Sequence, residues 1–190
     1  VDVYGVVERP AAAHHRVPAA RDRPKELEQA RLARPVDGAG AHHRDGKPAL
    51  VFAAHLANWE MPALPGAAHG LPSAVLYRAP NIGAVAGMAL NTRGVNMGEL
   101  IKTGLDAPMR AADALAAGKH VGMLVDQYYV RGVPVTFFGR RTMANPLLAR
   151  LARHFDCPIH GTRIVRLPNH RFRAELTEEI EPARDNEGKI

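Results

Sequence analysis

Short apolar runs alternate with amphipathic segments along most of this chain. The runs at residues 48–54, 73–77 and 121–125 are continuous and apolar, as expected of strands in a sheet that is covered on both faces. Residues 106–117 and 145–155 repeat apolar side chains every three to four positions, which predicts helices. Strands that alternate with helices indicate an α/β fold, with a mixed central sheet flanked by helices.

Four further segments complete the predicted domain. Residues 159–167 and 171–177 read as strands joined by a turn, and in the second strand apolar and charged residues alternate, which marks a half-exposed strand. Residues 58–64 predict a short helix with Asn58 as its N-cap. Residues 132–139 form a turn-rich segment.

The first 46 residues follow a different pattern. They contain little periodic apolar sequence, and only residues 23–32 predict a short helix. We therefore divide the chain into residues 1–46, interpreted as disordered or as an out-of-frame stretch, and an α/β domain at residues 47–190. Two His-His pairs lie in the first part, but their spacing is not typical of a zinc site.

Composition narrows the choice of partners. The net charge is +6, which favours acidic partners. One acidic residue, Asp156, accompanies eight arginines between residues 140 and 173: Arg140, Arg141, Arg150, Arg153, Arg163, Arg166, Arg171 and Arg173. Such a cluster can bind lipid phosphates, an acidic carrier protein or nucleic acid, or it can form a solvated face.

The location of the chain is constrained by two simple observations. The single cysteine, Cys157, cannot form an internal disulfide, which fits a reducing compartment and predicts a small buried residue. We find no apolar run near the roughly 18 residues that a membrane span needs, and no secretory signal. These features predict a soluble or peripheral protein.

Candidate chemistry is concentrated where the first predicted strand ends. His55 follows the apolar run at residues 48–54, and Glu60 lies five residues later, across a predicted strand-to-helix turn. Functional side chains often occupy this position in α/β folds. A neutral imidazole can accept a hydroxyl proton, and a nearby carboxylate can fix its tautomer. From the residues alone, the pair is either such a base or a structural contact.

The sequence HLANWE at residues 55–60 resembles a known family motif. It is similar to the His-x4-Asp/Glu motif of the glycerolipid acyltransferase superfamily, in the HxxNWE form of its lipid A biosynthesis (lauroyl-type, late) acyltransferases. Three further blocks resemble that family in the same order: Tyr77-Arg78 with Pro80-Asn81, GKHVGMLVDQ at 118–127, and VPVTFFGR at 133–140. The likeness runs from about residue 46 to residue 182.

The resemblance implies an activity and a set of roles. Members of the family move a fatty acyl chain from acyl carrier protein to a hydroxyl of the Kdo-bearing lipid A precursor, with no covalent acyl-enzyme, cofactor or metal. His55 would be the general base and Glu60 its partner, and Arg78 or Arg93 would stabilise the oxyanion. The family begins with a membrane anchor and continues past its last strand, so we expect a core truncated at its C-terminus.

Other residues receive weaker assignments. Asn58 is expected to shape the turn, Asp126 to hold Arg78 or the strand end or to be a structural acid, and Arg163 to bind substrate. The resemblance places the chain at the cytoplasmic face of the bacterial inner membrane, with an anionic glycolipid acceptor and no nucleic acid.

Two alternatives to this function stay open. The first is an acyltransferase for another lipid acceptor, such as a lysophospholipid or a phosphatidylinositol mannoside. The second is a non-catalytic fragment that binds lipid or nucleic acid. For Phe137-Phe138 we favour core packing over contact with a membrane surface.

Overall fold

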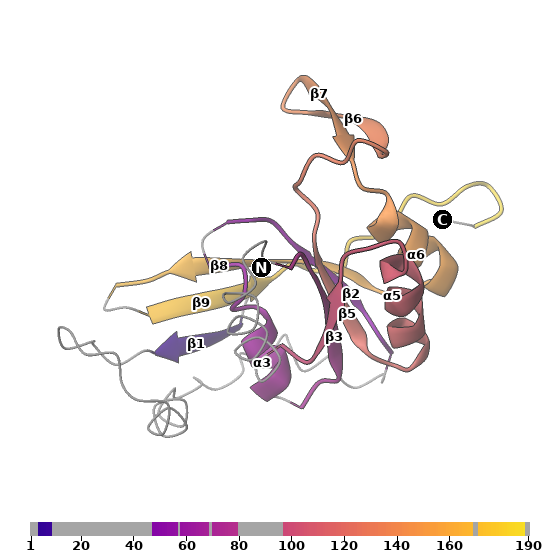
Figure 1. The fold of residues 1–190 in the computed structure, drawn as a ribbon. Helices are drawn as coiled ribbons and strands as arrows, with labels where there is room; N and C mark the ends of the chain where they lie inside the picture. Colours follow the sequence, from indigo (N-terminus) through magenta and orange to yellow (C-terminus); the bar gives the residue numbers. More distant parts are fainter. Residues whose placement is uncertain are drawn as a thin grey trace.

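The architecture is a single large sheet with helices packed against it and one separate hairpin (Figure 1). The computed structural model describes residues 4–8, 47–56, 58–68, 70–79, 97–168 and 171–188. The seven strands of the large sheet lie in the order β1-β9-β8-β2-β5-β3-β4. Their bounds are β1 Tyr4–Glu8, β2 Leu50–Ala53, β3 Ser73–Tyr77, β4 Glu99–Lys102, β5 His120–Leu124, β8 Ile159–Arg166 and β9 Arg171–Leu176.

Both strand directions occur in this sheet. Strands β8, β2, β5, β3 and β4 pair in parallel, whereas β9 runs antiparallel to β8 and β1 runs antiparallel to β9. The predicted α/β fold with a mixed central sheet and flanking helices is therefore confirmed. Because parallel strands end at one edge of the sheet, the residues that follow β2, β3 and β5 all lie along that edge.

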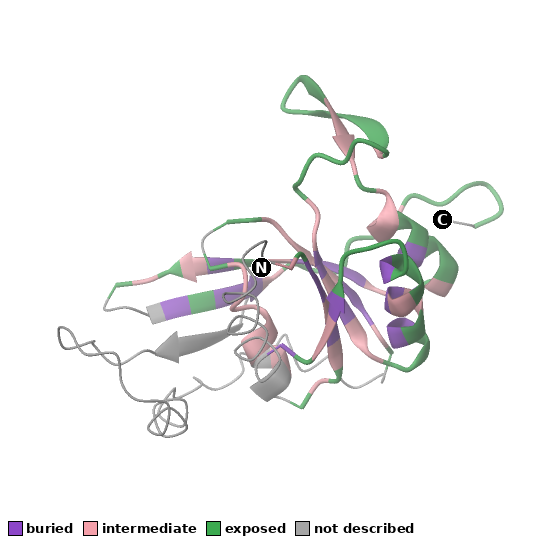
Figure 2. Cartoon of the chain, viewed as in Figure 1, coloured by how far each residue is buried: buried purple, intermediate pink, exposed green. Residues whose placement is uncertain are grey.

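The main core lies between the parallel strands and two helices, α5 (Ala107–Ala116) and α6 (Leu147–Phe155). Leu50, Val121 and Ile101 from the strands are completely buried, and Figure 2 shows buried residues gathered on the strands and the facing sides of both helices. The α5 residues in this core are Ala107, Ala111, Ala114 and Leu115. Small alanine side chains let the helix pack close to the sheet, which offsets the shortage of aromatic residues.

The helix boundaries follow local signals. Helix α5 has Pro108 in its first turn, where the missing N–H costs nothing, and Gly118 follows it at φ +76°, a conformation that suits glycine. The N–H of Leu147 at the start of α6 donates to the Asn145 side-chain oxygen at 3.0 Å. The predicted helix at 58–64 begins later, because residues 58–62 form a turn and α3 spans Ala63–Ala68.

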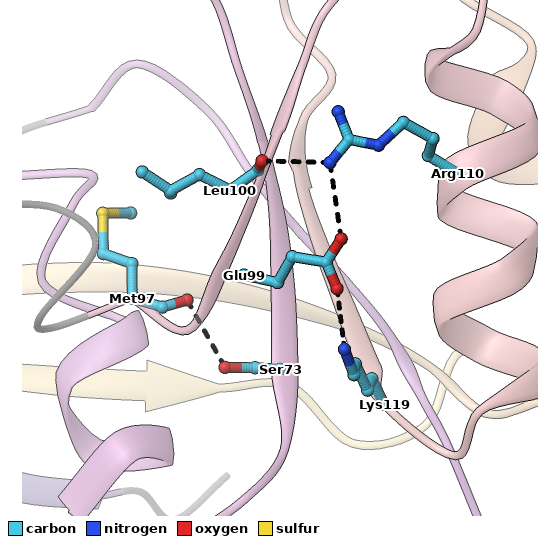
Figure 3. A network of polar contacts seen from close by, with 6 residues as sticks. All are labelled: Ser73, Met97, Glu99, Leu100, Arg110 and Lys119. Atoms are coloured by element: carbon cyan, nitrogen blue, oxygen red, sulfur yellow. Dashed lines mark hydrogen bonds and ion pairs between the residues drawn. The ribbon is translucent and has the colours of Figure 1, made fainter. Parts of the chain in front are cut away.

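The amino-terminal edge of the parallel strands is held by a polar network (Figure 3). The Glu99 carboxylate at the start of β4 accepts hydrogen bonds from Lys119 at 2.7 Å and from Arg110 of α5 at 3.4 Å. The hydrogen bond from Lys119 is the largest influence that lowers the pKa of Glu99. This network joins β4, α5 and the residue before β5, so it fixes the helix against the sheet edge.

The turn-rich segment predicted at residues 132–139 is instead half of a hairpin. Strand β6 (Val133–Phe137) pairs antiparallel with β7 (Arg140–Ala144), and the hairpin projects away from the sheet (Figure 1). All of β6 is exposed. The favoured core packing of Phe137-Phe138 is wrong, because their exposed fractions are 66% and 90%.

Besides β6 and β7 of the hairpin, two strands of the large sheet, β4 and β1, were missed by the sequence patterns. The four-residue strand β4 has Glu99 and Lys102 at its ends, which hides its apolar centre. Strand β1 lies in the first segment, where no strand was predicted; the helix predicted at residues 23–32 lies outside the described residues. Within the described part of the chain, no helix has the length and apolar character that crossing a bilayer requires.

Candidate active site

The site is built where two adjacent parallel strands end. Strands β2 and β5 pair with Leu50 opposite Val121 and Ala53 opposite Leu124. The pairing continues beyond both strands, because the Val125 N–H donates to the Ala53 carbonyl at 3.1 Å. Since 121 − 50 and 126 − 55 both equal 71, this register brings His55 level with Asp126. Backbone pairing alone therefore places an imidazole beside a carboxylate.

Asp126 binds His55 at two points. The His55 Nδ1 lies 2.8 Å from Asp126 Oδ1, and the His55 backbone N–H donates to Oδ2 at 2.9 Å. Partial burial would raise the pKa of the Asp126 carboxyl, but the hydrogen bonds from the His55 backbone and ring outweigh it and leave that pKa below its usual value. Asp126 is thus ionised at neutral pH and orients the imidazole.

The second ring nitrogen of His55, Nε2, is the one that can accept a proton. A hydrogen on Nδ1 satisfies the Asp126 contact, which makes Nε2 the acceptor. Gln127 Nε2 lies 3.3 Å from this nitrogen, and the Trp59 ring lies beside the imidazole with centroids 5.7 Å apart. The His55 side chain is 37% exposed. An oriented imidazole on a partly exposed side chain is what a general base for a hydroxyl group needs.

Glu60 and Asn58 lie in the turn that follows His55. The Asn58 Nδ2 lies 3.5 Å from the Met61 sulfur, and Asn58 is exposed, while Glu60 is half-buried. The Asn58 contact is the kind expected of a turn-shaping residue. The carboxylate that binds the His55 ring in this structure is Asp126; the role of Glu60 as partner stays a prediction.

The arginine candidates are spread over different parts of the sheet. Arg78 follows β3 at the same edge as His55, and it is exposed. Among the described ion pairs, none joins Arg78 to Asp126, whose carboxylate instead holds the end of β2. Arg163 on β8 pairs with Glu175 at 2.6 Å, and this contact is the main reason why the pKa of Glu175 is lowered. Arg93 lies outside the described residues.

The structure adds one residue that the sequence interpretation missed. Gln127 was part of a recognised block but received no role, although its amide contacts Nε2 of His55. Its position directly after the Asp126 carboxylate at a strand end was the available signal. Cys157 is buried as predicted, and burial raises the pKa of its thiol, which suits a packing residue rather than a nucleophile.

These features define a class of protein. It is an α/β enzyme with a carboxylate-oriented histidine at the carboxyl edge of a parallel sheet. The family model described as bacterial lipid A biosynthesis acyltransferase matches residues 24–188. The chain belongs to this family, and it is an acyltransferase of lipid A biosynthesis. The resemblance seen in the motifs is confirmed. A comparison with curated proteins finds no significant match.

Proposed function

We propose that this chain transfers a fatty acyl group from acyl carrier protein to a hydroxyl of the Kdo-bearing lipid A precursor, with His55 as general base. The single observation that carries the proposal is the His55–Asp126 contact of 2.8 Å, which engages Nδ1 and leaves Nε2 as the ring nitrogen that can accept a proton. Membership of the lipid A acyltransferase family supports the choice of reaction. The acyl donor and the acceptor follow from the motif resemblance.

The reaction is direct transfer. His55 Nε2 takes the proton of the acceptor hydroxyl, and the hydroxyl oxygen attacks the carbonyl carbon of the thioester. The tetrahedral intermediate collapses by breaking the carbon–sulfur bond, which forms the new ester. The imidazolium then returns the proton to the carrier's thiolate, so that protons and electron pairs balance and His55 is regenerated.

The neighbouring residues take supporting roles in this mechanism. Asp126 holds the His55 tautomer and stabilises the imidazolium that forms. Glu60, which the motif pairs with His55, adds negative charge in the turn after β2. An arginine donor suits the oxyanion, and Arg78 at the same sheet edge is our candidate, together with Arg93. Arg163 is a more distant candidate for binding acceptor phosphates.

We place the enzyme peripherally at the cytoplasmic face of the inner membrane, where both substrates meet. Both are anionic: the acceptor carries phosphates and the donor protein is acidic. The exposed arginines Arg140 and Arg141 favour such partners. Nucleic acid is not an expected partner.

The test is acyl transfer by the purified chain in detergent, with lauroyl- or myristoyl-acyl carrier protein and the lipid A precursor. We expect His55→Ala to lower the rate by roughly 10²- to 10⁴-fold, the range that general-base catalysis contributes. His154→Ala is the matched control, because His154 is an exposed histidine on α6, and we expect it to retain the wild-type rate.

The same assay separates the alternatives. A His55→Ala variant as active as the wild type would refute His55 as the base. Transfer to a lysophospholipid or phosphatidylinositol mannoside, but not to the lipid A precursor, would keep the mechanism and change the acceptor. Tight duplex-DNA binding at moderate salt with no transfer to any lipid would favour the non-catalytic alternative.

A further inference from the structure

The β6–β7 hairpin carries an unusual amount of exposed apolar surface. Figure 1 shows the hairpin projecting from the body of the protein. Of the eleven large hydrophobic side chains exposed in the described part of the chain, seven lie in or just before it: Tyr128, Tyr129, Val130, Val133, Val135, Phe137 and Phe138. Seven exposed apolar side chains gathered in one projecting segment indicate a docking site rather than scattered surface positions.

The tip of the hairpin carries phenylalanines at positions that are unfavourable for the stability of the fold. Phe138 and Gly139 form the two-residue turn, both with positive φ (47° and 74°). This pattern belongs to a type I′ turn, in which asparagine, aspartate and glycine are preferred. A phenylalanine there is strained and is 90% exposed. Its ring packs edge-on against Phe137, with centroids 4.7 Å apart. Strain and exposure together suggest that the aromatic tip has a function.

The charged residues around the hairpin tip indicate which kind of apolar partner the tip binds. Residues 128–144 contain Arg131, Arg140 and Arg141 and no acidic residue. All three arginines are exposed, and Arg140 is the cross-strand partner of Phe137. Aromatic and basic residues in this combination are typical of elements that enter the interfacial region of a membrane, where rings reach the acyl boundary and guanidinium groups meet phosphates.

We infer that the β6–β7 hairpin is a membrane-docking element that inserts Phe137 and Phe138 into an anionic lipid surface, with Arg140 and Arg141 bound to headgroup phosphates. The segment leads directly from the active-site edge, since Gln127 precedes Tyr128. Docking through the hairpin therefore holds His55 close to the bilayer in which the acceptor lies. The choice of a lipid occupant rests on the proposed function.

Vesicle flotation with the full chain tests the aromatic tip. The probes are vesicles of phosphatidylglycerol with phosphatidylethanolamine, and vesicles of phosphatidylcholine alone. We expect binding to the anionic vesicles and a loss of about tenfold or more in Phe138→Asn, because one buried aromatic group is removed. Asparagine suits the turn, so this variant keeps the hairpin folded. Leu105→Asn is the matched control, because Leu105 is 98% exposed outside the hairpin, and it should bind like the wild type.

The arginines are tested by the same measurement. Arg140→Ala/Arg141→Ala should lower partitioning about thirtyfold, since each basic residue near an anionic surface contributes about fivefold to binding. Arg153→Ala/Arg166→Ala removes the same charge elsewhere on the surface and should change binding less than about threefold. Added salt should weaken wild-type binding but not abolish it, because the apolar contribution is not screened.

Several results would overturn the inference. Wild-type protein that does not float with anionic vesicles, or Phe138→Asn that floats as well as the wild type, would exclude insertion of the tip. Equal losses of vesicle binding in Arg140→Ala/Arg141→Ala and in Arg153→Ala/Arg166→Ala would indicate that the whole surface attracts the vesicles by charge, without docking through the hairpin. Loss of carrier-protein binding in Phe138→Asn, with vesicle binding unchanged, would assign the hairpin to the donor. Because acyl transfer is measured in detergent, failure of docking is distinguishable from failure of the proposed function.

Discussion

The two edges of the parallel sheet each carry a carboxylate, but the two carboxylates have different partners. At the amino-terminal edge, Glu99 is bound by Lys119 and Arg110. At the carboxyl edge, Asp126 is bound by the ring and backbone of His55. Both carboxyls have a lowered pKa, in Glu99 mainly through the Lys119 hydrogen bond and in Asp126 through the His55 contacts that outweigh burial.

The difference separates a structural network from the proposed catalytic site. Lysine and arginine keep their protons at neutral pH, so the Glu99 network can only hold α5 and β4 together. Histidine exchanges its proton near neutral pH and retains a second nitrogen. In the proposed mechanism, a similar carboxylate therefore stabilises the fold at one edge and orients the His55 base at the other.

The largest expected effect is at the carboxyl edge. Asp126→Asn should lower kcat by roughly 10²- to 10³-fold with little change in KM, because the amide no longer stabilises the imidazolium or accepts both His55 hydrogen bonds. The measurement is steady-state acyl transfer, with thermal unfolding to check the fold. Glu60→Gln is the comparison and should cost less. A larger loss in Glu60→Gln would show that Glu60, not Asp126, is the main partner of His55.

At the amino-terminal edge, the largest expected effect is on stability. Gly98 has φ +75°, and a Cβ there would lie 2.4 Å from the Ser73 carbonyl oxygen. Gly98→Ala should lower the free energy of unfolding by roughly 2–3 kcal/mol, from backbone strain and overpacking. Urea denaturation measures it, and activity per folded molecule should be unchanged.

A second glycine provides the control for this prediction. Gly118 has a similar φ of +76°, but no atom lies within 4 Å of the position that a Cβ would take there. Gly118→Ala should therefore show the strain alone, about 1 kcal/mol. Equal losses in the two variants would show that the contact with Ser73 contributes nothing, and that the edge adapts more easily than its geometry indicates.

Local patterns predicted the elements that the sheet buries. The apolar run at 73–77 coincides with β3, and the helix at 106–117 differs from α5 by one residue at each end. These segments are long or apolar enough for their periodicity to decide the outcome. Strand β4 was missed because only Leu100 and Ile101 are apolar in it, and its place is set by pairing with β3.

Half of the candidate site could likewise be predicted from local sequence. His55 was found because a motif and a strand end coincide at one position. Its contact with Asp126 was not predicted, because the two residues are 71 positions apart and meet only through the β2–β5 register. Likewise, nothing in the local sequence indicates that Phe137 and Phe138 are exposed, since an apolar pair in a strand usually faces a core. Pairing partners and packing are non-local properties, and they were the parts that sequence patterns could not supply.

The smallest expected effect comes from the Glu99 network itself. Glu99→Gln should lower the free energy of unfolding by only about 0.5–1 kcal/mol at pH 7. All three side chains are more than a third exposed (Glu99 37%, Lys119 34%, Arg110 40%), so water screens their charges.

The folded pKa of Glu99 is lowered, so its contribution to stability is complete above the unfolded pKa of about 4.5 and is lost as the pH falls through the folded pKa. Chemical denaturation at pH 7 and pH 3 should therefore show a difference between wild type and variant that shrinks in acid. Transfer activity should stay at the wild-type level, since no proton is exchanged at this edge; a rate loss in Glu99→Gln comparable to that in Asp126→Asn would break the distinction between the two edges.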